Sequence, residues 1–320
     1  MIEAAQLSKR YGKAVAVDAV SFRVEPGQVL GFLGPNGAGK TTTMRMLAGF
    51  LTPSAGVARI CGRDVAHDPP AAQRQLGYLP EGAPSYGEMR VGDFLKFISD
   101  VRGINGARRR QRLDDVAERL DLTGVWLQTI DTLSKGFRRR VGLAQAIIDD
   151  PPVLILDEPT DGLDPNQKHE VRSLIHAMRD KTVIVSTHIL EEVEAVCTRA
   201  IIINEGSIVA DATPQALLAK SRYAGAISVR AAHPSVVRDR LLRLAGVAAV
   251  EVDTGGGRVL ALARPGVDLY TEIEQMLRAE QVEIHELTRE RGRLDDVFRA
   301  LTRPVVASSD PIAMQAGRLA

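Results

Sequence analysis

Residues 34–41 read Gly34-Pro35-Asn36-Gly37-Ala38-Gly39-Lys40-Thr41, and they follow the apolar run VLGFL at residues 29–33. The octapeptide matches the phosphate-binding loop pattern GxxxxGK[ST] in full, and the run before it predicts a strand. The glycines let successive backbone N–H groups turn toward one phosphate, while the helix expected near Lys40 directs its positive end at the same anion. We expect Lys40 to reach the β- and γ-phosphates of a nucleotide and the Thr41 hydroxyl to meet magnesium.

The composition of the whole chain is that of a globular protein with about two domains. The chain has 320 residues, of which 45% are apolar and 25% charged. That length exceeds one ordinary domain. Lys and Arg total 41 against 40 for Asp and Glu. This balance leaves no bulk basic surface for DNA or RNA, so no nucleic-acid partner is expected.

Cysteine content and hydropathy indicate a reducing, non-membrane environment. Cys61 and Cys197 are the only cysteines. They are too few for a disulfide framework or a zinc site, and we expect both to be buried. No apolar run approaches the ~20 residues that cross a bilayer, and residues 1–12 lack the layout of a signal peptide. We therefore expect the chain to stay in the cytoplasm.

Apolar runs and helical spacing predict an α/β fold over the first two thirds of the chain. Short strands are expected before residue 33, a helix at 42–50, and a helical insertion from about 91 to 148. Continuous apolar runs then alternate with helical segments, the pattern of a parallel sheet buried on both faces. These runs lie at residues 153–156, 182–186 and 200–203.

The remaining third predicts a separate α+β domain. After a boundary near residues 218–224 the pattern is strand, helix, strand, strand, helix, strand, an order compatible with a ferredoxin-like module. We divide the chain into a nucleotide-binding domain at 1–220, with a helical subdomain at about 85–150, and an accessory domain at 221–303. Residues 304–320 show no periodic pattern and are expected to be a disordered tail.

Two carboxylates end the strand predicted at residues 153–156. They are Asp157 and Glu158, followed by Pro159. Their position puts them at the carboxyl edge of the sheet, where open α/β sheets bind ligands. Asp157 can hold magnesium there, and Glu158 can polarise an attacking water. The alternative, a merely polar strand end, is disfavoured by the phosphate loop upstream.

Two further segments point at phosphate. Residues 133–137 read LSKGF, a Ser/Gly segment at a predicted helix start, with the Ser134 hydroxyl and the Gly136 amide expected to face outward. The chain would thus carry two anion sites. His188 is the one histidine of six that ends a predicted core strand, in STH at 186–188. A lone histidine is more often structural, but this position favours a contact with a γ-phosphate.

Five ordered segments resemble the ATP-binding subunit of an ATP-binding cassette (ABC) transporter over residues 1 to about 220. They are GPNGAGKTT at 34–42, LSKGF at 133–137, VLILDEP at 153–159, GLDP at 162–165 and STH at 186–188. The nearer resemblance is to ATPases that pair with separate multidrug or polysaccharide-type export permeases, including the gliding-motility type. It rests on LSKGFRRRVGLAQAI, LDEPTDGLDPNQ, HILEEVEAVC and RLDDVFRALT, the last typical of their extra C-terminal domain.

The resemblance implies roles for the residues that bind the nucleotide in this subunit. Tyr11 corresponds to the aromatic residue that stacks on adenine. Gly34 through Thr42 correspond to the phosphate loop, and Asp157 to the magnesium-binding aspartate. Glu158 corresponds to the general base, and His188 to the switch that senses the γ-phosphate.

The resemblance also implies that a second subunit completes the site. Ser134, Lys135 and Gly136 correspond to signature residues that contact the nucleotide held by the opposite subunit. Asp164 corresponds to a loop that communicates across the dimer. A lone monomer is therefore expected to bind ATP and hydrolyse it poorly.

Two positions depart from the family pattern. Glu81 stands where glutamine is usual; a carboxylate can still ligate magnesium but donates no hydrogen bond when ionised. Export-type relatives often share this YLPE form. The usual LSGGQ is LSKGF here, which introduces Lys135. This lysine either attracts the phosphate of the opposite site or is simply solvated.

Basic runs at residues 107–112 and 138–140 favour solvated helix faces over contacts with a permease or lipid headgroups.

The resemblance implies an ATPase that binds ATP and Mg²⁺ and dimerises with a second copy of itself or a related subunit. It would power export by a membrane permease from the cytoplasmic side of the membrane. One alternative is a cytosolic ABC-type ATPase acting on nucleic acid or the ribosome, but such proteins usually carry two cassettes or a long coiled coil. A regulatory nucleotide sensor with a degenerate site is the other, and the presence of Lys40, Asp157, Glu158 and His188 weighs against it.

Overall fold

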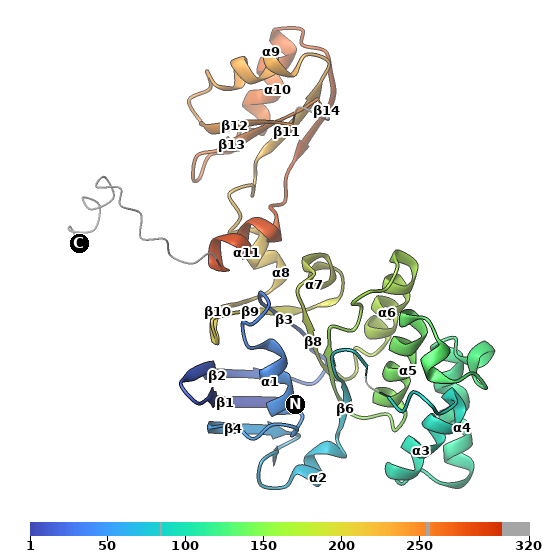
Figure 1. Ribbon diagram of the computed structural model, residues 1–320. Coiled ribbons are helices and arrows are strands. Elements are labelled where there is room, and N and C mark those ends of the chain that lie inside the picture. Colours follow the sequence, from blue (N-terminus) through green and yellow to red (C-terminus); the bar gives the residue numbers. More distant parts are fainter. Residues whose placement is uncertain (84, 254–256, 303–320) are drawn as a thin grey trace. The chain divides into compact units, whose positions relative to one another are not determined.

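The computed structural model describes residues 1–83, 85–253 and 257–302, so the expected tail lies outside the described residues. The chain divides into two compact units, Met1–Leu217 and Leu218–Ala320 (Figure 1). Each unit has its own apolar core. In the described part of the chain no helix combines the length and the apolar character needed to span a membrane.

A six-stranded sheet forms the centre of the first unit, in the order β10-β9-β3-β8-β7-β6. The strands are β3 (Val29–Leu33), β6 (Leu76–Leu79), β7 (Val153–Asp157), β8 (Thr182–Thr187), β9 (Arg199–Asn204) and β10 (Ser207–Ala212). All neighbours are parallel except β9 and β10. Every residue of β3, β7 and β8 is buried, as their continuous apolar runs predicted.

A second, antiparallel sheet has the order β2-β1-β4-β5. Its strands are β1 (Ile2–Tyr11), β2 (Ala14–Val24), β4 (Ala55–Ile60) and β5 (Arg63–Asp64). Phe22 from this sheet, Phe32 from the central sheet and Met44 from α1 (Lys40–Leu47) share one core. The expectation for Cys61 was wrong, because it lies exposed in the turn between β4 and β5; Cys197 is buried.

The predicted helical insertion is a group of helices on one side of the first unit (Figure 1). The helices of this unit are α2 (Pro69–Gln73), α3 (Val91–Val101), α4 (Gly106–Arg119), the short η1 (Thr123–Val125) and η2 (Ile130–Thr132), α5 (Lys135–Ile147), α6 (Pro165–Ala177) and α7 (Leu190–Val196), with α8 (Pro214–Leu218) at its end. α5 approaches β6 so closely that a Cβ on Gly77 would lie 1.9 Å from the carbonyl oxygen of Ala146. This contact fixes α5 against the central sheet.

The second unit has the βαββαβ order that the sequence predicted. Its elements are β11 (Ile227–Ala231), α9 (Pro234–Leu241), β12 (Val247–Asp253), β13 (Arg258–Ala263), α10 (Tyr270–Ala279), β14 (Ile284–Arg289) and α11 (Leu294–Thr302). The strands form an antiparallel sheet in the order β12-β13-β11-β14. Val237 and Ile273 of the two middle helices pack with Val229 and Val259 of the sheet.

Candidate active site

Parallel register brings the predicted site residues to one edge of the central sheet. Leu33, the last residue of β3, pairs with Thr187 of β8, and Asp157, the last residue of β7, pairs with Ser186. The phosphate loop follows β3, Asp157 ends β7 with Glu158 directly after it, and His188 follows β8. The sheet therefore holds three separate segments of sequence at the same edge.

The loop is built so tightly that glycine is required. A Cβ on Gly34 would lie 2.4 Å from the carbonyl oxygen of Ile203, and one on Gly39, whose φ is +105°, would lie 2.6 Å from that of Ala16. α1 then starts at Lys40, as expected from the loop. The loop lines a cavity of about 260 Å³. Lining residues are Ala16, Asn36, Gly37, Gly39, Lys40, Thr41, Thr42, Glu81 and Glu158.

Lys40 is held inside its own loop. Its side chain is only 7% exposed, and Nζ donates to the carbonyl oxygens of Gly34 (2.8 Å) and Pro35 (3.3 Å). Nζ also lies 4.0 Å from Oε1 of Glu158. Burial lowers the pKa of Lys40, and the Glu158 carboxylate opposes that shift most strongly. A phosphate entering the loop would replace the carbonyls with a better partner.

Oxygen atoms suited to magnesium gather beside the loop. Asp157 is fully buried; its Oδ1 accepts a hydrogen bond from Ser186 Oγ, while its Oδ2 has no partner among the described residues. Burial raises the pKa of Asp157. Thr41 Oγ1 lies 3.4 Å from Oε2 of Glu81. A carboxylate oxygen without a donor, a hydroxyl and a second carboxylate are hard ligands that fit Mg²⁺. Sequence reasoning missed Ser186, although it stands inside the quoted STH motif.

Glu158 and His188 contact one another at the same edge of the sheet. The Glu158 side chain is 9% exposed, and its Oε2 lies 2.9 Å from Nδ1 of His188, whose side chain is half exposed. Burial raises the pKa of the Glu158 carboxyl, and His188 and Lys40 oppose this. The backbone of Glu158 is left-handed, with φ +51°. Such a conformation costs on the order of 1–3 kcal/mol in a non-glycine residue and concentrates at functional sites.

The signature residues lie apart from this cavity, at the start of α5. Ser134 caps the helix, its Oγ accepting from the Phe137 N–H (3.3 Å). Lys135 is exposed to solvent, one of the two alternatives considered, and its Nζ also donates to Asp161 (2.9 Å). Its contact with the phosphate of an opposite site stays a prediction. Gly136 is buried, and a Cβ there would lie 2.6 Å from the Gln167 amide, so only Ser134 and Lys135 are exposed.

Asp164 and Tyr11 also lie outside the cavity lining. Asp164 caps α6 and forms a capping box with Gln167, the Gln167 N–H donating to it at 2.9 Å. Tyr11 ends β1 and is 53% exposed, with Lys9 Nζ 5.4 Å from its ring centroid. The structure therefore brings the loop, Glu81, Asp157, Glu158 and His188 together at one sheet edge. Tyr11, Ser134, Lys135 and Asp164 lie exposed outside the cavity, and Gly136 lies buried outside it.

The solvated-face expectation was wrong for two of the arginines at residues 138–140. Arg138 is exposed, but Arg139 and Arg140 are 3% and 8% exposed, because α5 is packed on nearly all sides. Arg140 bonds to Asp121 (3.1 Å) and Glu170 (2.5 Å). The terminal nitrogens of Arg139 have no partner within the described residues, and burial lowers its pKa. By contrast Arg108 and Arg110 on α4 are exposed, as expected.

Replacing Arg139 with methionine is expected to stabilise the chain in the absence of nucleotide. A buried polar group without a hydrogen bond costs about 1–3 kcal/mol, and an apolar side chain of similar length removes that cost. Urea unfolding of Arg139→Met should show a free energy of unfolding higher by about that amount. Arg138→Met, at an exposed neighbour, should change it by less than about 0.5 kcal/mol. Destabilisation by Arg139→Met would mean that the guanidinium has a partner.

A phosphate loop, a buried strand ending in two carboxylates and a histidine-ended neighbour define an ATPase of the nucleotide-binding cassette class. Residues 17–161 match the family model for the ABC transporter. The chain is 34% identical over 303 residues to the Nod factor export ATP-binding protein I of Paraburkholderia xenovorans (strain LB400), covering 94% of this chain and 96% of that protein. It therefore belongs to the ABC transporter family, among the export-type ATP-binding subunits, as its motifs predicted.

Other comparisons agree. The chain is 37% identical over 223 residues to the probable multidrug ABC transporter ATP-binding protein YbhF of Escherichia coli (strain K12), covering 69% of this chain and 38% of that protein. A solved ATP-binding subunit of an ABC transporter superposes with a TM-score of 0.64 at 29% identity, over 68% of this chain and 91% of that one. A dimeric bacterial cassette shares the fold, with a TM-score of 0.63 at 21% identity over 67% and 99% of the two chains.

Proposed function

We propose that this chain binds MgATP and hydrolyses it as one half of a dimer that powers export by a separate membrane permease, attached to the cytoplasmic side of the membrane. The observation that carries the proposal is the division of the site. Lys40, Asp157 and Glu158 meet at one sheet edge, whereas Ser134 and Lys135 are displayed at the start of α5, outside that cavity. Such an arrangement suits two chains that each complete the other's site.

In this proposal the loop N–H groups and Lys40 bind the phosphates, with Nζ leaving the carbonyls of Gly34 and Pro35. Thr41, Glu81 and Asp157 hold magnesium, which would spread the charge of the transferring phosphoryl group. Glu158 accepts a proton from the attacking water, oriented by its 2.9 Å contact with His188. Phosphoryl transfer needs mainly such positioning and charge stabilisation.

The partner subunit would supply the second anion-binding end. Ser134 caps a 13-residue helix that Lys135 begins, and the N-terminus of such a helix favours a negative ligand. Lys135 is now paired with Asp161, so it would exchange this carboxylate for a phosphate when the dimer closes. Closure and release of two such chains convert ATP binding and hydrolysis into motion of the permease.

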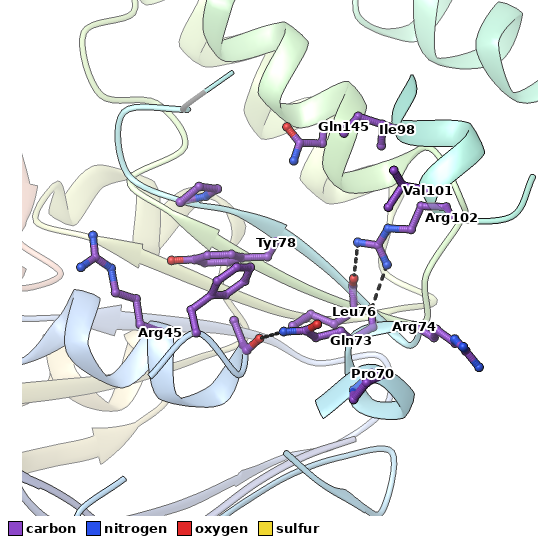
Figure 2. A pocket seen from close by; sticks show the side chains of 13 residues that line it. Arg45, Pro70, Gln73, Arg74, Leu76, Tyr78, Ile98, Val101, Arg102 and Gln145 are labelled. Carbon is purple, nitrogen blue, oxygen red and sulfur yellow. Dashed lines mark hydrogen bonds between the residues drawn. The ribbon is translucent and has the colours of Figure 1, made fainter. Parts of the chain in front are cut away.

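A groove beside the central sheet offers a docking place for the permease. Its volume is about 690 Å³. Figure 2 shows Leu76 and Tyr78 of β6 between Arg45 of α1 and Val101 of α3, and the groove walls bear exposed apolar side chains, with Phe50 66% and Val101 68% exposed. The lining residue Pro80 immediately precedes Glu81 in sequence. A segment of the permease bound in this groove would contact Pro80, whose neighbour in sequence, Glu81, lines the nucleotide cavity.

The docking proposal is tested by Val101→Asp. A charge on this apolar wall should remove most association of the tagged chain with membranes that contain its permease, because an unpaired charge would be buried on docking. ATP binding should stay unchanged. Val209→Asp, on exposed strand β10, is the control and should keep both properties. Sedimentation of the chain with membranes measures the effect, and undiminished association of Val101→Asp would exclude this groove.

A further inference from the structure

Glu192 is a buried carboxylate whose role the mechanism above leaves open. It lies in the first turn of α7 and is 2% exposed. A carboxyl group so deeply buried needs hydrogen bonds to its oxygens. Both have one: Thr160 Oγ1 donates to Oε1, and Thr187 Oγ1 donates to Oε2 at 3.0 Å. Two hydroxyls therefore hold this carboxylate in place.

The two threonines are close in sequence to Glu158 and His188, which we call the hydrolytic pair because the proposed function assigns them to hydrolysis. Thr160 follows Glu158 by two residues, and Thr187 directly precedes His188. Both hydroxyl-bearing residues are at most 2% exposed. The carboxylate of Glu192 thus bridges the segment that carries Glu158 to the segment that carries His188. Glu158 and His188 are themselves in contact at 2.9 Å. This contact, the two bonds to Glu192 and the short backbone segments between them form a closed ring at the ends of β7 and β8.

The pattern of donors suits a carboxylate better than an amide. Thr187 Oγ1 already accepts a hydrogen bond from the N–H of Ile189 at 3.0 Å, which leaves its proton to be donated to Glu192. A carboxylate offers acceptors on both oxygens, whereas the amide nitrogen of glutamine is only a donor. Glutamine would therefore keep one of the two bonds on a neutral oxygen and reverse the other, with its amide nitrogen donating to a threonine hydroxyl. The bridge would be weakened with little change in side-chain volume.

Neither member of the hydrolytic pair is otherwise well fixed. The imidazole of His188 is half exposed, and the backbone of Glu158 is in a left-handed conformation that needs its surroundings to hold it. Two bonds already tie the strand ends, one from the Glu158 N–H to the carbonyl oxygen of Ser186 (3.0 Å) and one from Ser186 Oγ to Asp157 Oδ1. The Glu192 bridge adds a further tie beyond them, between the segments that carry Glu158 and His188.

We propose that Glu192 is a positioning residue for ATP hydrolysis: through Thr160 and Thr187 it sets the relative placement of Glu158 and His188. The inference rests on the proposed hydrolytic function, since it assigns Glu192 no contact with ATP. A residue that only anchored α7 would affect folding and nucleotide binding alike. A positioning residue affects turnover while nucleotide binding is preserved.

The experiment compares Glu192→Gln with Glu191→Gln, its exposed neighbour on the same helix. The full chain should show a kcat for ATP lower by about 10- to 100-fold in Glu192→Gln, the size of effect that small displacements of reacting groups produce. Its affinity for ADP, measured by calorimetry, should stay within about twofold of wild type because the ADP contacts lie in the phosphate loop. Glu191→Gln should match wild type in both. Thr160→Val and Thr187→Val, which each remove one bond, should reproduce the fall in kcat even if Glu192→Gln folds poorly.

A double-mutant cycle with His188→Ala separates positioning from anchoring. If Glu192 acts through the pair, Glu192→Gln should cost clearly less in the His188→Ala background than in wild type. Fully additive losses, an equal loss of ADP affinity, or a wild-type kcat in Glu192→Gln would each overturn the positioning role. Failure of the wild-type chain to hydrolyse ATP, or undiminished hydrolysis by Glu158→Gln, would instead overturn the proposed function itself.

Discussion

Glu158→Gln is expected to abolish ATP turnover while leaving ATP binding intact. Glutamine keeps the shape of the side chain and can still meet His188, but it cannot accept the proton of the attacking water. A general base typically contributes on the order of 10²–10⁴-fold to rate, and kcat should fall by that factor. Steady-state phosphate release measures the loss.

The same substitution should stabilise the ATP-bound dimer. Glu158 Oε1 lies 4.0 Å from Nζ of Lys40, so removing its charge leaves the lysine freer to neutralise phosphate. Without hydrolysis the closed dimer persists, and size-exclusion chromatography in ATP should show it. Glu191→Gln, exposed on α7, is the matched control and should behave as wild type. Hydrolysis near the wild-type rate in Glu158→Gln would reject Glu158 as the base.

The sheet edge could be predicted because its chemistry follows strand ends. Asp157 and the loop at 34–41 each directly follow a run that is buried along its whole length, and neighbouring parallel strands bring such ends together. Contacts through space could not be predicted in the same way. Lys135 is exposed to water, as one of the two expectations had it, but its ion pair with Asp161, 26 residues further along the chain, was not predicted.

The burial of individual side chains also could not be predicted from the sequence. Arg139 and Arg140 stand in a run of three arginines, which resembles a solvated face, but α5 is packed on both sides of that run. Strand β5 of the antiparallel sheet was not predicted for another reason. It has only two residues, Arg63 and Asp64, too few for any period of hydrophobicity to show. The strained backbone of Glu158 likewise depends on the surrounding fold.

Lys40→Met should remove most of the stabilisation that ATP confers. The ammonium group forms charge-assisted hydrogen bonds with phosphate that are worth about 1.5–3 kcal/mol, which corresponds to roughly 10- to 150-fold in affinity. At an ATP concentration of 100 times the wild-type Kd, the wild-type chain gains about 2.7 kcal/mol of stability. The variant should then gain only about 0.3–1.4 kcal/mol by the same linkage relation. Urea unfolding with and without ATP measures the difference.

The nucleotide-free stability of this variant tells whether Lys40 is lost as a ligand or as a part of the fold. The buried ammonium is only partly satisfied by the carbonyls of Gly34 and Pro35, and burial lowers its pKa, so methionine relieves a desolvation cost while it removes two donors from the loop. These opposing effects should leave the nucleotide-free stability within about 1 kcal/mol of wild type. Lys220→Met, at an exposed lysine, should preserve the full response to ATP. An unchanged response in Lys40→Met would show that Nζ stays on the loop carbonyls when ATP binds and never reaches the phosphates.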